Sequence, residues 1–322
     1  MDGRKRNRRR MPTLPRKIVN QFVPKDIWQY VGIVGTLACV IIFLREPSFP
    51  TPDKLLIFLT FIFLYFHQGL QLLKRLLPFV AILLVYESFR GIADHLNTNV
   101  NFTAMISADK WMFGSLPTAK LQEWLWHGSV QWYDFVFYTP YVLHFVVPVG
   151  LVILVWKLRE SFYWRAVTMY IILSFMGFFT YLLYPAAPPW MANDAGYIEP
   201  IERISSHVWF AMGLHDFPSF YSEISPNPVA AVPSLHAAYA LLFSMIVFKL
   251  FGKKWGALSL LYPVILTVGI IYQGEHYAVD ALLGFIYAAA AYCLTLWLFK
   301  KVDPKLNQQL SKLFRINKKY KV

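Results

Sequence analysis

The sequence predicts an all-α fold, a polytopic membrane helix bundle of about eight transmembrane helices, and three observations support that fold class. The 322-residue chain is 57% hydrophobic and only 15% charged, whereas soluble domains carry about 25% charged residues. Its apolar residues occur in runs of roughly 18 to 25, the length that crosses a bilayer as a helix. Its basic residues flank these runs, which is typical of the cytoplasmic ends of membrane spans.

The predicted spans follow the apolar runs from the first, which starts near Ile27, to the last, which ends before Lys300. Basic residues separate the second span from the third, the fourth from the fifth and the sixth from the seventh. Pro233 suits the first turn of a helix and therefore opens the sixth span. We place the eight spans at residues 27–44, 55–73, 76–96, 133–156, 163–184, 233–250, 256–274 and 278–299.

These spans divide the chain into four parts. They are a basic cytoplasmic tail (1–26), two accessory transmembrane helices (27–75), a membrane domain (76–299) and a second basic cytoplasmic tail (300–322). No internal repeat suggests a transporter built from two related halves.

The positions of the basic residues predict the orientation and the partners. With the N-terminus inside, only six of the 31 Lys and Arg residues lie outside, so 25 lie in the tails and inner connections. This asymmetry places both termini in the cytoplasm. The net charge of +13 would also fit nucleic acid, but no folded basic domain accompanies the basic runs. We therefore expect the bilayer surface as a partner and no nucleic acid.

Three polar stretches lie at the ends of spans that this orientation places outside. Residues 184–190 (Tyr-Pro-Ala-Ala-Pro-Pro-Trp) end the fifth span, and residues 231–238 (Ala-Val-Pro-Ser-Leu-His-Ala-Ala) open the sixth. Residues 272–280 (Tyr-Gln-Gly-Glu-His-Tyr-Ala-Val-Asp) join the seventh span to the eighth. Because all three fall on one side of the membrane, the sequence predicts an extracytoplasmic site.

The third stretch contains a candidate nucleophile. His276 and Asp280 are four residues apart, so they share one face if the last helix begins there. A carboxylate at this spacing accepts the proton of one imidazole nitrogen and leaves the other nitrogen free to attack. The alternative is a histidine that pairs with an aspartate for helix stability alone.

The second stretch adds an anion site and a second histidine. Ser234 can cap a helix whose first amides point at an anion, and His236 lies in that first turn. A phosphate held there would meet His236 as proton donor and His276 as attacking group. Ionisable residues near the membrane are costly and usually functional. His144, in the fourth span, is a further candidate to line the cavity.

These motifs resemble a known family. Pro-Ser-Leu-His-Ala at 233–237, followed by His-Tyr-x-x-Asp at 276–280, is similar to the signature of the type 2 phosphatidic acid phosphatase superfamily. Pro-Ala-Ala-Pro-Pro-Trp at 185–190 resembles the branch that includes inositol phosphorylceramide synthases and their bacterial relatives. With weaker similarity at 86–94 and 116–118, the resemblance covers most of residues 80–290.

The resemblance implies a six-helix phosphatase-like core within residues 76–299 and a metal-independent enzyme without cofactors. His276 would become a phosphohistidine, Asp280 would orient its ring, and His236 would protonate the departing alkoxide. The implied activity is lipid phosphotransfer of the inositol-phosphoryl type, from a phospholipid or lipid phosphate to a lipid alcohol. The alternative is a phosphatase that acts on a lipid phosphate or polyprenyl diphosphate.

Two further classes of function stay open. A transporter or lipid-binding scaffold would not require His236 and His276 to face each other, and a metal-dependent alcohol phosphotransferase would need clustered aspartates, which the sequence lacks. We expect an integral protein of a bacterial cytoplasmic membrane, with a Golgi-type membrane as the alternative.

The sequence departs from the superfamily at the phosphate-binding positions. The basic first motif, a lysine followed by Arg-Pro, is absent, and Ile270 stands where an arginine usually precedes the nucleophile by six residues. Other groups must therefore bind the phosphate, and the alternative role of Arg90 is an ion pair with Glu87 or Asp94 on its own helix. The candidate substrate-binding residues are Ser234 with the adjacent Leu235 amide, Arg90, Arg203 and Trp190, the last as a cover for the headgroup.

Overall fold

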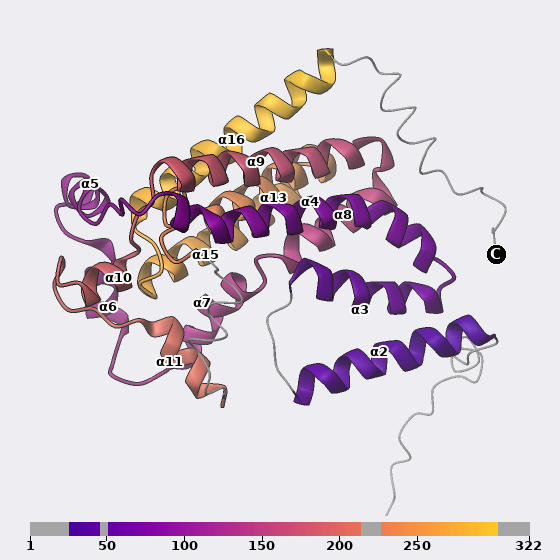
Figure 1. The fold of residues 1–322 in the computed structure, drawn as a ribbon, viewed down its shortest axis with the longest axis horizontal. Coiled ribbons are helices and arrows are strands. Elements are labelled where there is room, and N and C mark those ends of the chain that lie inside the picture. Colours follow the sequence, from indigo (N-terminus) through magenta and orange to yellow (C-terminus); the bar gives the residue numbers. More distant parts are fainter. Residues whose placement is uncertain (1–25, 46–50, 214–226, 302–322) are drawn as a thin grey trace, which may run out of the picture.

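A computed structural model describes residues 26–45, 51–213 and 227–301. The predicted basic tails, apart from their innermost residues, lie outside these ranges. The described chain is helical, and most of its longer helices run roughly along one direction (Figure 1). The helices of the bundle are α2 (Ile27–Arg45), α3 (Pro52–Tyr65), α4 (Gly69–Leu96), α7 (Trp132–Val142), α8 (Val146–Leu158), α9 (Tyr163–Leu183), α13 (Leu235–Phe251), the seven-residue α14 (Lys253–Ser259), α15 (Leu261–Tyr272) and α16 (Ala278–Lys301).

The predicted all-α membrane bundle is confirmed. Within the described ranges, five helical segments are long and apolar enough to cross a membrane, and the bent pair α7–α8 adds a sixth. The other two predicted spans correspond to shorter helices, α13 with 17 residues and α3 with 14. A helix of 14 residues rises only about 21 Å, less than the hydrocarbon thickness.

The boundary between the second and third spans differs from the prediction. We expected a connection at Lys74–Arg75, but α4 begins at Gly69 and continues through both residues. The chain turns earlier because His67 adopts a left-handed conformation (φ 56°), which commonly ends a helix. The predicted domain boundary after residue 75 therefore falls inside α4, where Arg75 is buried and paired with Glu160.

The predicted fourth span is broken into α7 and α8, whose axes differ by 57°. Pro148 lies in the first turn of α8 and cannot bond to the carbonyl of residue 144, with which its ring also clashes. Residues 143–145 therefore leave the helix. Pro263 has the same relation to residue 259, where α14 ends and α15 follows.

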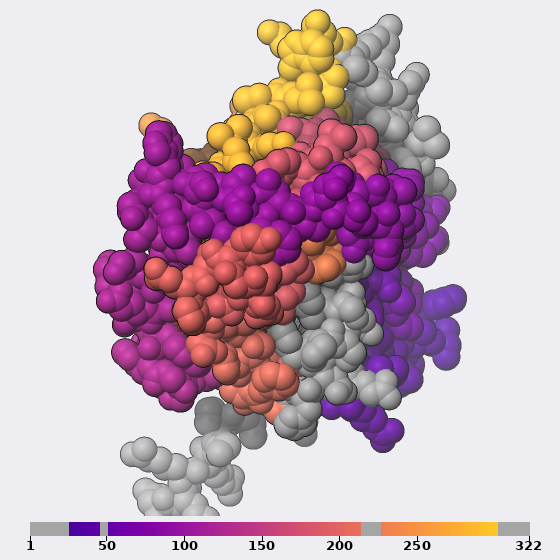
Figure 2. Space-filling model, turned by 60° about the vertical axis from the view of Figure 1, so that its left-hand side comes forward, coloured from indigo at the N-terminus to yellow at the C-terminus, as the bar shows by residue number. Residues whose placement is uncertain are grey.

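Four further short helices gather at one end of the bundle (Figure 1), and a 3₁₀ turn (Glu160–Phe162) directly precedes α9. The four helices are α5 (Ala104–Phe113), α6 (Pro117–Leu125), α10 (Pro189–Asp194) and α11 (Ile204–Ala211). Figure 2 shows α10 and α11 on the face between α4 and the α5–α6 segment. The start of α2 and the end of α16 lie away from these short helices (Figure 1).

The bundle packs around α13, which contacts α9, α15 and α16. Its largest apolar cluster contains Phe79, Tyr170 and Tyr239, and a second cluster joins α7 and α11 to α15. By contrast, α2 packs on α3 and exposes most of its apolar side chains. This arrangement places the first turns of α13 and α16 beside the short helices.

Candidate active site

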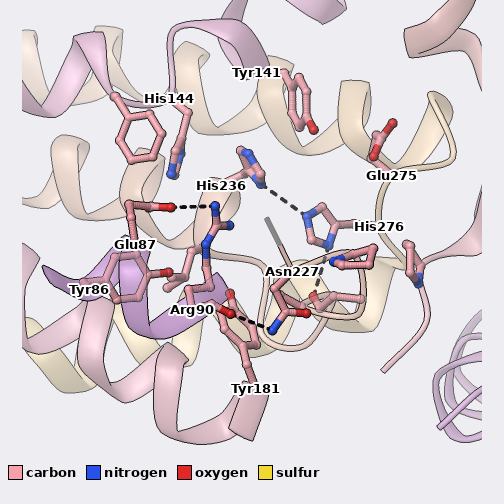
Figure 3. Close-up of a pocket in the computed structure, with 16 residues that line it drawn as sticks. Tyr86, Glu87, Arg90, Tyr141, His144, Tyr181, Asn227, His236, Glu275 and His276 are labelled. Carbon is pink, nitrogen blue, oxygen red and sulfur yellow. Dashed lines mark hydrogen bonds and ion pairs between the residues drawn. The ribbon is translucent and has the colours of Figure 1, made fainter. Parts of the chain in front are cut away.

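A cavity at the end with the short helices brings together residues from five regions of the chain (Figure 3). Its lining combines aromatic, charged and imidazole side chains. The lining residues are Tyr86, Glu87, Arg90, Tyr141, His144, Phe145, Tyr181, Pro188, Asn227, Pro228, Ala230, Ala231, Leu235, His236, Glu275 and His276.

The two predicted catalytic histidines face each other in this cavity. Nδ1 of His236 lies 3.3 Å from Nε2 of His276, as Figure 3 shows by a dashed line. Nδ1 of His276 lies 3.1 Å from the carbonyl oxygen of Ala231. Because a carbonyl only accepts hydrogen bonds, Nδ1 of His276 carries the proton. In the neutral ring, Nε2 then presents its lone pair to the cavity and accepts the Nδ1 proton of His236.

Asp280 supports the His276 ring from behind. Its Oδ2 atom lies 3.5 Å from Nδ1 of His276 and accepts a 2.8 Å hydrogen bond from the Tyr277 amide. The Asp280 side chain is fully buried. The carboxylate therefore faces the protonated nitrogen and favours the ring state in which Nε2 is free.

A close approach of two helix ends places the histidines together. The Ser234 amide donates a 2.9 Å hydrogen bond to the Asp280 carbonyl, and the Ser234 hydroxyl accepts from the Ala237 amide at the start of α13. A Cβ atom at Gly284 would lie 2.4 Å from the Ser234 carbonyl oxygen. Glycine at this position thus lets α16 approach the first turn of α13.

The cavity wall opposite the histidine pair comes from α4. The side chains of Arg90 and Glu87 form an ion pair of 2.7 Å, and both are largely buried. Asn227 donates a 3.1 Å hydrogen bond to the Arg90 carbonyl. The predicted pairing of Arg90 with Glu87 is therefore present, and the pair itself lines the cavity.

Two other predicted substrate-binding residues lie beside the cavity, behind Glu275. Arg203 donates to both carboxylate oxygens of Glu275, at 3.0 and 3.3 Å, and its guanidinium lies 4.0 Å from the centre of the Trp190 ring. Ser205 also donates to Glu275. Glu275 lines the cavity, whereas Arg203, Trp190 and Ser234 do not.

Comparisons with known proteins identify the family of the chain. A family model described as the PAP2 superfamily matches residues 103–294. The chain belongs to the PAP2 superfamily. It is also 31% identical over 257 residues to a phosphoinositol dihydroceramide synthase from Bacteroides thetaiotaomicron, an alignment that covers 73% of this chain and 79% of that protein. No solved structure gives a significant match.

Family membership shows that the protein is an enzyme of the lipid phosphatase and phosphotransferase type. With its apolar helices, it is an integral membrane protein. The predicted relation to the branch with inositol phosphorylceramide synthases is also confirmed. In the ranges that the structure describes, no group of three His, Cys, Asp or Glu side chains is arranged to hold a metal ion.

Several lining residues of this PAP2 enzyme were not predicted as site residues. Three of them lie outside the stretches that the sequence singled out and carry no local signal: Tyr141, Tyr181 and Asn227. Tyr86 begins the stretch 86–94, and Glu275 directly precedes the nucleophile candidate, so the sequence indicated these two positions but not their roles. His144, which the sequence offers as a cavity candidate, lies with its ring centre 4.3 Å from that of His236.

Proposed function

We propose that this PAP2 enzyme transfers an inositol-phosphoryl headgroup from a phospholipid to a lipid alcohol. The reaction proceeds through a phosphohistidine on His276, at the extracytoplasmic face of a bacterial cytoplasmic membrane. The observation that carries the proposal is the 3.3 Å approach of the imidazoles of His236, which is half-buried, and His276, which is buried. Transfer, rather than hydrolysis, is supported by the similarity to a protein named as a synthase.

In the first half-reaction, the Nε2 lone pair of His276 attacks phosphorus and the bond from phosphorus to the glycerol oxygen breaks. His236, protonated on both nitrogens next to the anionic substrate, gives its Nδ1 proton to the departing alkoxide, and diacylglycerol leaves. The phosphorylated His276 ring is cationic. It keeps its Nδ1 proton, which the Asp280 carboxylate and the Ala231 carbonyl stabilise.

In the second half-reaction, a lipid alcohol gives its proton to Nδ1 of His236 as its oxygen attacks phosphorus. The bond from phosphorus to Nε2 of His276 breaks, and both imidazoles return to their starting states. Water in place of the alcohol would give hydrolysis. Since the two nitrogens form a direct hydrogen bond in the structure, the bound phosphoryl group must replace that bond.

The proposed orientation rests on the basic residues and on the placement of the site. The described chain ends lie away from the short helices that surround the cavity (Figure 1). Cytoplasmic termini, as the charge asymmetry predicts, then leave the cavity on the extracytoplasmic side. A lipid substrate can enter from that leaflet without carrying its headgroup across the bilayer.

The test is a transfer assay with membranes that contain the full-length protein. Inositol-labelled phosphatidylinositol is supplied with ceramide or with diacylglycerol as the acceptor, and lipid products are separated. We expect label in a new inositol-phosphoryl lipid that requires the acceptor and is absent with the His276→Ala protein. Release of water-soluble inositol phosphate alone would show hydrolysis and contradict the transfer proposal.

We propose Arg90 as the phosphate-binding cation, because its ion pair with Glu87 lines the cavity and, among the residues that the structure describes, no other arginine does. Arg90→Lys keeps the charge but loses the planar fork that binds two oxygens at once. We expect the KM for the phospholipid to rise about 10-fold, equivalent to about 1.4 kcal/mol, with a small change in kcat.

Arg75 provides a matched control for this measurement. It is a second buried arginine on α4, paired with Glu160, and its position 15 residues away places it about 22 Å along the helix. Arg75→Lys should leave the KM unchanged. Equal KM values for the Arg90→Lys and wild-type proteins would contradict the phosphate role of Arg90.

A separate prediction concerns Asp280. In Asp280→Asn the amide can still accept from the Tyr277 amide, but it no longer provides a negative charge next to Nδ1 of His276. We expect kcat to fall about 100-fold, at the lower end of the contribution of positioned proton-transfer groups. Turnover by purified Asp280→Asn protein checks this, and a kcat within twofold of wild type would refute the role of the carboxylate.

A further inference from the structure

The turn that carries His276 is held at both ends by the α5–α6 segment, which lies about 150 to 170 positions earlier in the chain. We propose that Asp109 and Gln122 are positioning residues for His276, an inference that rests on its proposed role as nucleophile. Neither side chain lines the cavity, so both would act through the backbone of the turn.

Asp109, on α5, holds the C-terminal end of the turn. Its fully buried carboxylate accepts hydrogen bonds from the amides of Ala278 and Val279, at 3.0 and 2.9 Å. These are the first two amides of α16, which have no partner within their own helix. Burial raises the pKa of the Asp109 carboxyl, and the two amides oppose that rise. The two amides therefore stabilise the charged form of Asp109, and the carboxylate in turn satisfies the unpaired amides at the start of α16.

The sequence at the start of α16 explains why a distant acid is needed. Helix N-termini are usually capped by Ser, Thr, Asp or Asn directly before the first turn, but Tyr277 occupies that position. Asp280 reaches back only to the Tyr277 amide. Asp109 thus provides the missing cap from another helix. The first amide that it caps, that of Ala278, lies two residues after His276.

Gln122, on α6, holds the opposite end of the turn. Its Nε2 atom donates to the Tyr272 carbonyl at 2.8 Å and to the Glu202 carbonyl at 2.7 Å, and its Oε1 atom accepts from the Glu202 amide at 2.8 Å. Tyr272 is the last residue of α15. One side chain thus joins the end of α15 to the segment that precedes α11.

Both contacts bear on the angle at which the His276 ring enters the cavity. The ring meets its partners at Ala231 and His236 only while the turn between α15 and α16 keeps its place. Tyr277, which packs against Ile106 and Leu116 of the α5–α6 region, adds an apolar contact on the same side. A displacement of about 1 Å at a reacting group costs on the order of 100-fold in rate.

The experiment compares kcat and KM of full-length variants in the transfer assay, per amount of folded protein. Asp109→Asn keeps the shape but only one acceptor oxygen, and Asp109→Ala removes both. We expect kcat to fall about 10-fold for the first and about 100-fold for the second, with the phospholipid KM within twofold of wild type. Gln122→Met, which keeps the length of the side chain, should also lower kcat at constant KM.

Asp26 provides the control. It also accepts hydrogen bonds from two amides at the start of a helix, those of Trp28 and Gln29 in α2, and α2 packs on α3. Asp26→Ala should leave kcat per folded molecule unchanged. If the Asp109 and Gln122 variants keep wild-type kcat per folded molecule, or if Asp26→Ala lowers kcat as much as Asp109→Ala does, the positioning proposal is overturned.

The His276→Ala protein separates this proposal from the one on which it rests. Inactive His276→Ala with fully active Asp109 and Gln122 variants would overturn only the positioning role. Active His276→Ala protein would overturn the proposed nucleophile itself. Should Asp109→Ala fail to accumulate, the Asp109→Asn and Gln122→Met proteins decide the outcome.

Discussion

Replacement of His276 with alanine is expected to abolish transfer while the protein stays folded. The variant removes the atom that forms the covalent bond to phosphorus in the proposed mechanism, and no second imidazole presents a lone pair from the same position. We expect the rate to fall by on the order of 10,000-fold or more, as when other enzymes lose their nucleophile. The measurement is turnover of labelled phosphatidylinositol per folded molecule.

His95→Ala is the control for this substitution. His95 is exposed, lies in the last turn of α4 and does not line the cavity. The control should turn over at the wild-type rate. Full activity in the His276→Ala protein, at the same level of folded enzyme, would exclude the proposed covalent route.

Replacement of His236 with alanine is expected to slow transfer by about 100- to 10,000-fold, the range typical of a lost general acid or base. The loss should depend on the leaving group. A p-nitrophenyl ester of inositol phosphate releases an anion that needs no proton, so the first half-reaction should be largely spared in the variant. The burst of p-nitrophenol and the rate with phosphatidylinositol measure the two cases.

The same two measurements also show which outcome would contradict the role of His236 as proton donor. If His236 donates the proton, the activated ester retains a burst while the natural substrate does not. Equal losses with both substrates would mean that His236 serves only to shape the cavity. His144→Gln, which changes a ring that packs on His236, should show no such dependence on the leaving group.

Much of the fold and the proximity of His236 and His276 were predictable because the relevant signals are local. The length of each apolar run identifies a membrane span, and Pro233 and Ser234 indicate the start of a helix. The spacing of His276 and Asp280 predicted that they lie close together, and the structure places Nδ1 of His276 3.5 Å from Oδ2 of Asp280. The predicted shared helical face is wrong, because α16 begins at Ala278 and His276 lies in the turn before it. The alternating direction of the spans was sufficient to predict that His236 lies at the same end of the bundle as His276.

The features that the sequence did not reveal depend on contacts between distant segments. The break at residues 143–145 follows from one proline, Pro148, inside a run whose composition is otherwise that of a single span. Asp109 gave no signal, because the helix that it caps begins 169 residues later. The ion pair of Arg203 could not be predicted from neighbouring residues either, because its partner Glu275 lies 72 positions later in the sequence.

The similarity to a synthase of Bacteroides thetaiotaomicron covers residues far beyond the two histidine motifs. The cavity differs from a simple cationic phosphate site, because both of its glutamates are paired with arginines: Glu87 with Arg90 and Glu275 with Arg203. With each acidic charge neutralised, the polar wall suits a neutral, hydroxyl-rich headgroup better than a cationic one. This supports inositol as the group transferred with the phosphate.

The most direct test is to trap the covalent intermediate. Full-length enzyme is mixed with phosphatidylinositol in the absence of acceptor, quenched under alkaline conditions that preserve phosphohistidine, and digested for peptide mass spectrometry. We predict an inositol-phosphoryl adduct on the peptide that contains His276, absent from the His276→Ala protein and removed when ceramide is added before quenching. Steady turnover with no adduct on any histidine, or with the adduct on a residue other than His276, would contradict the account.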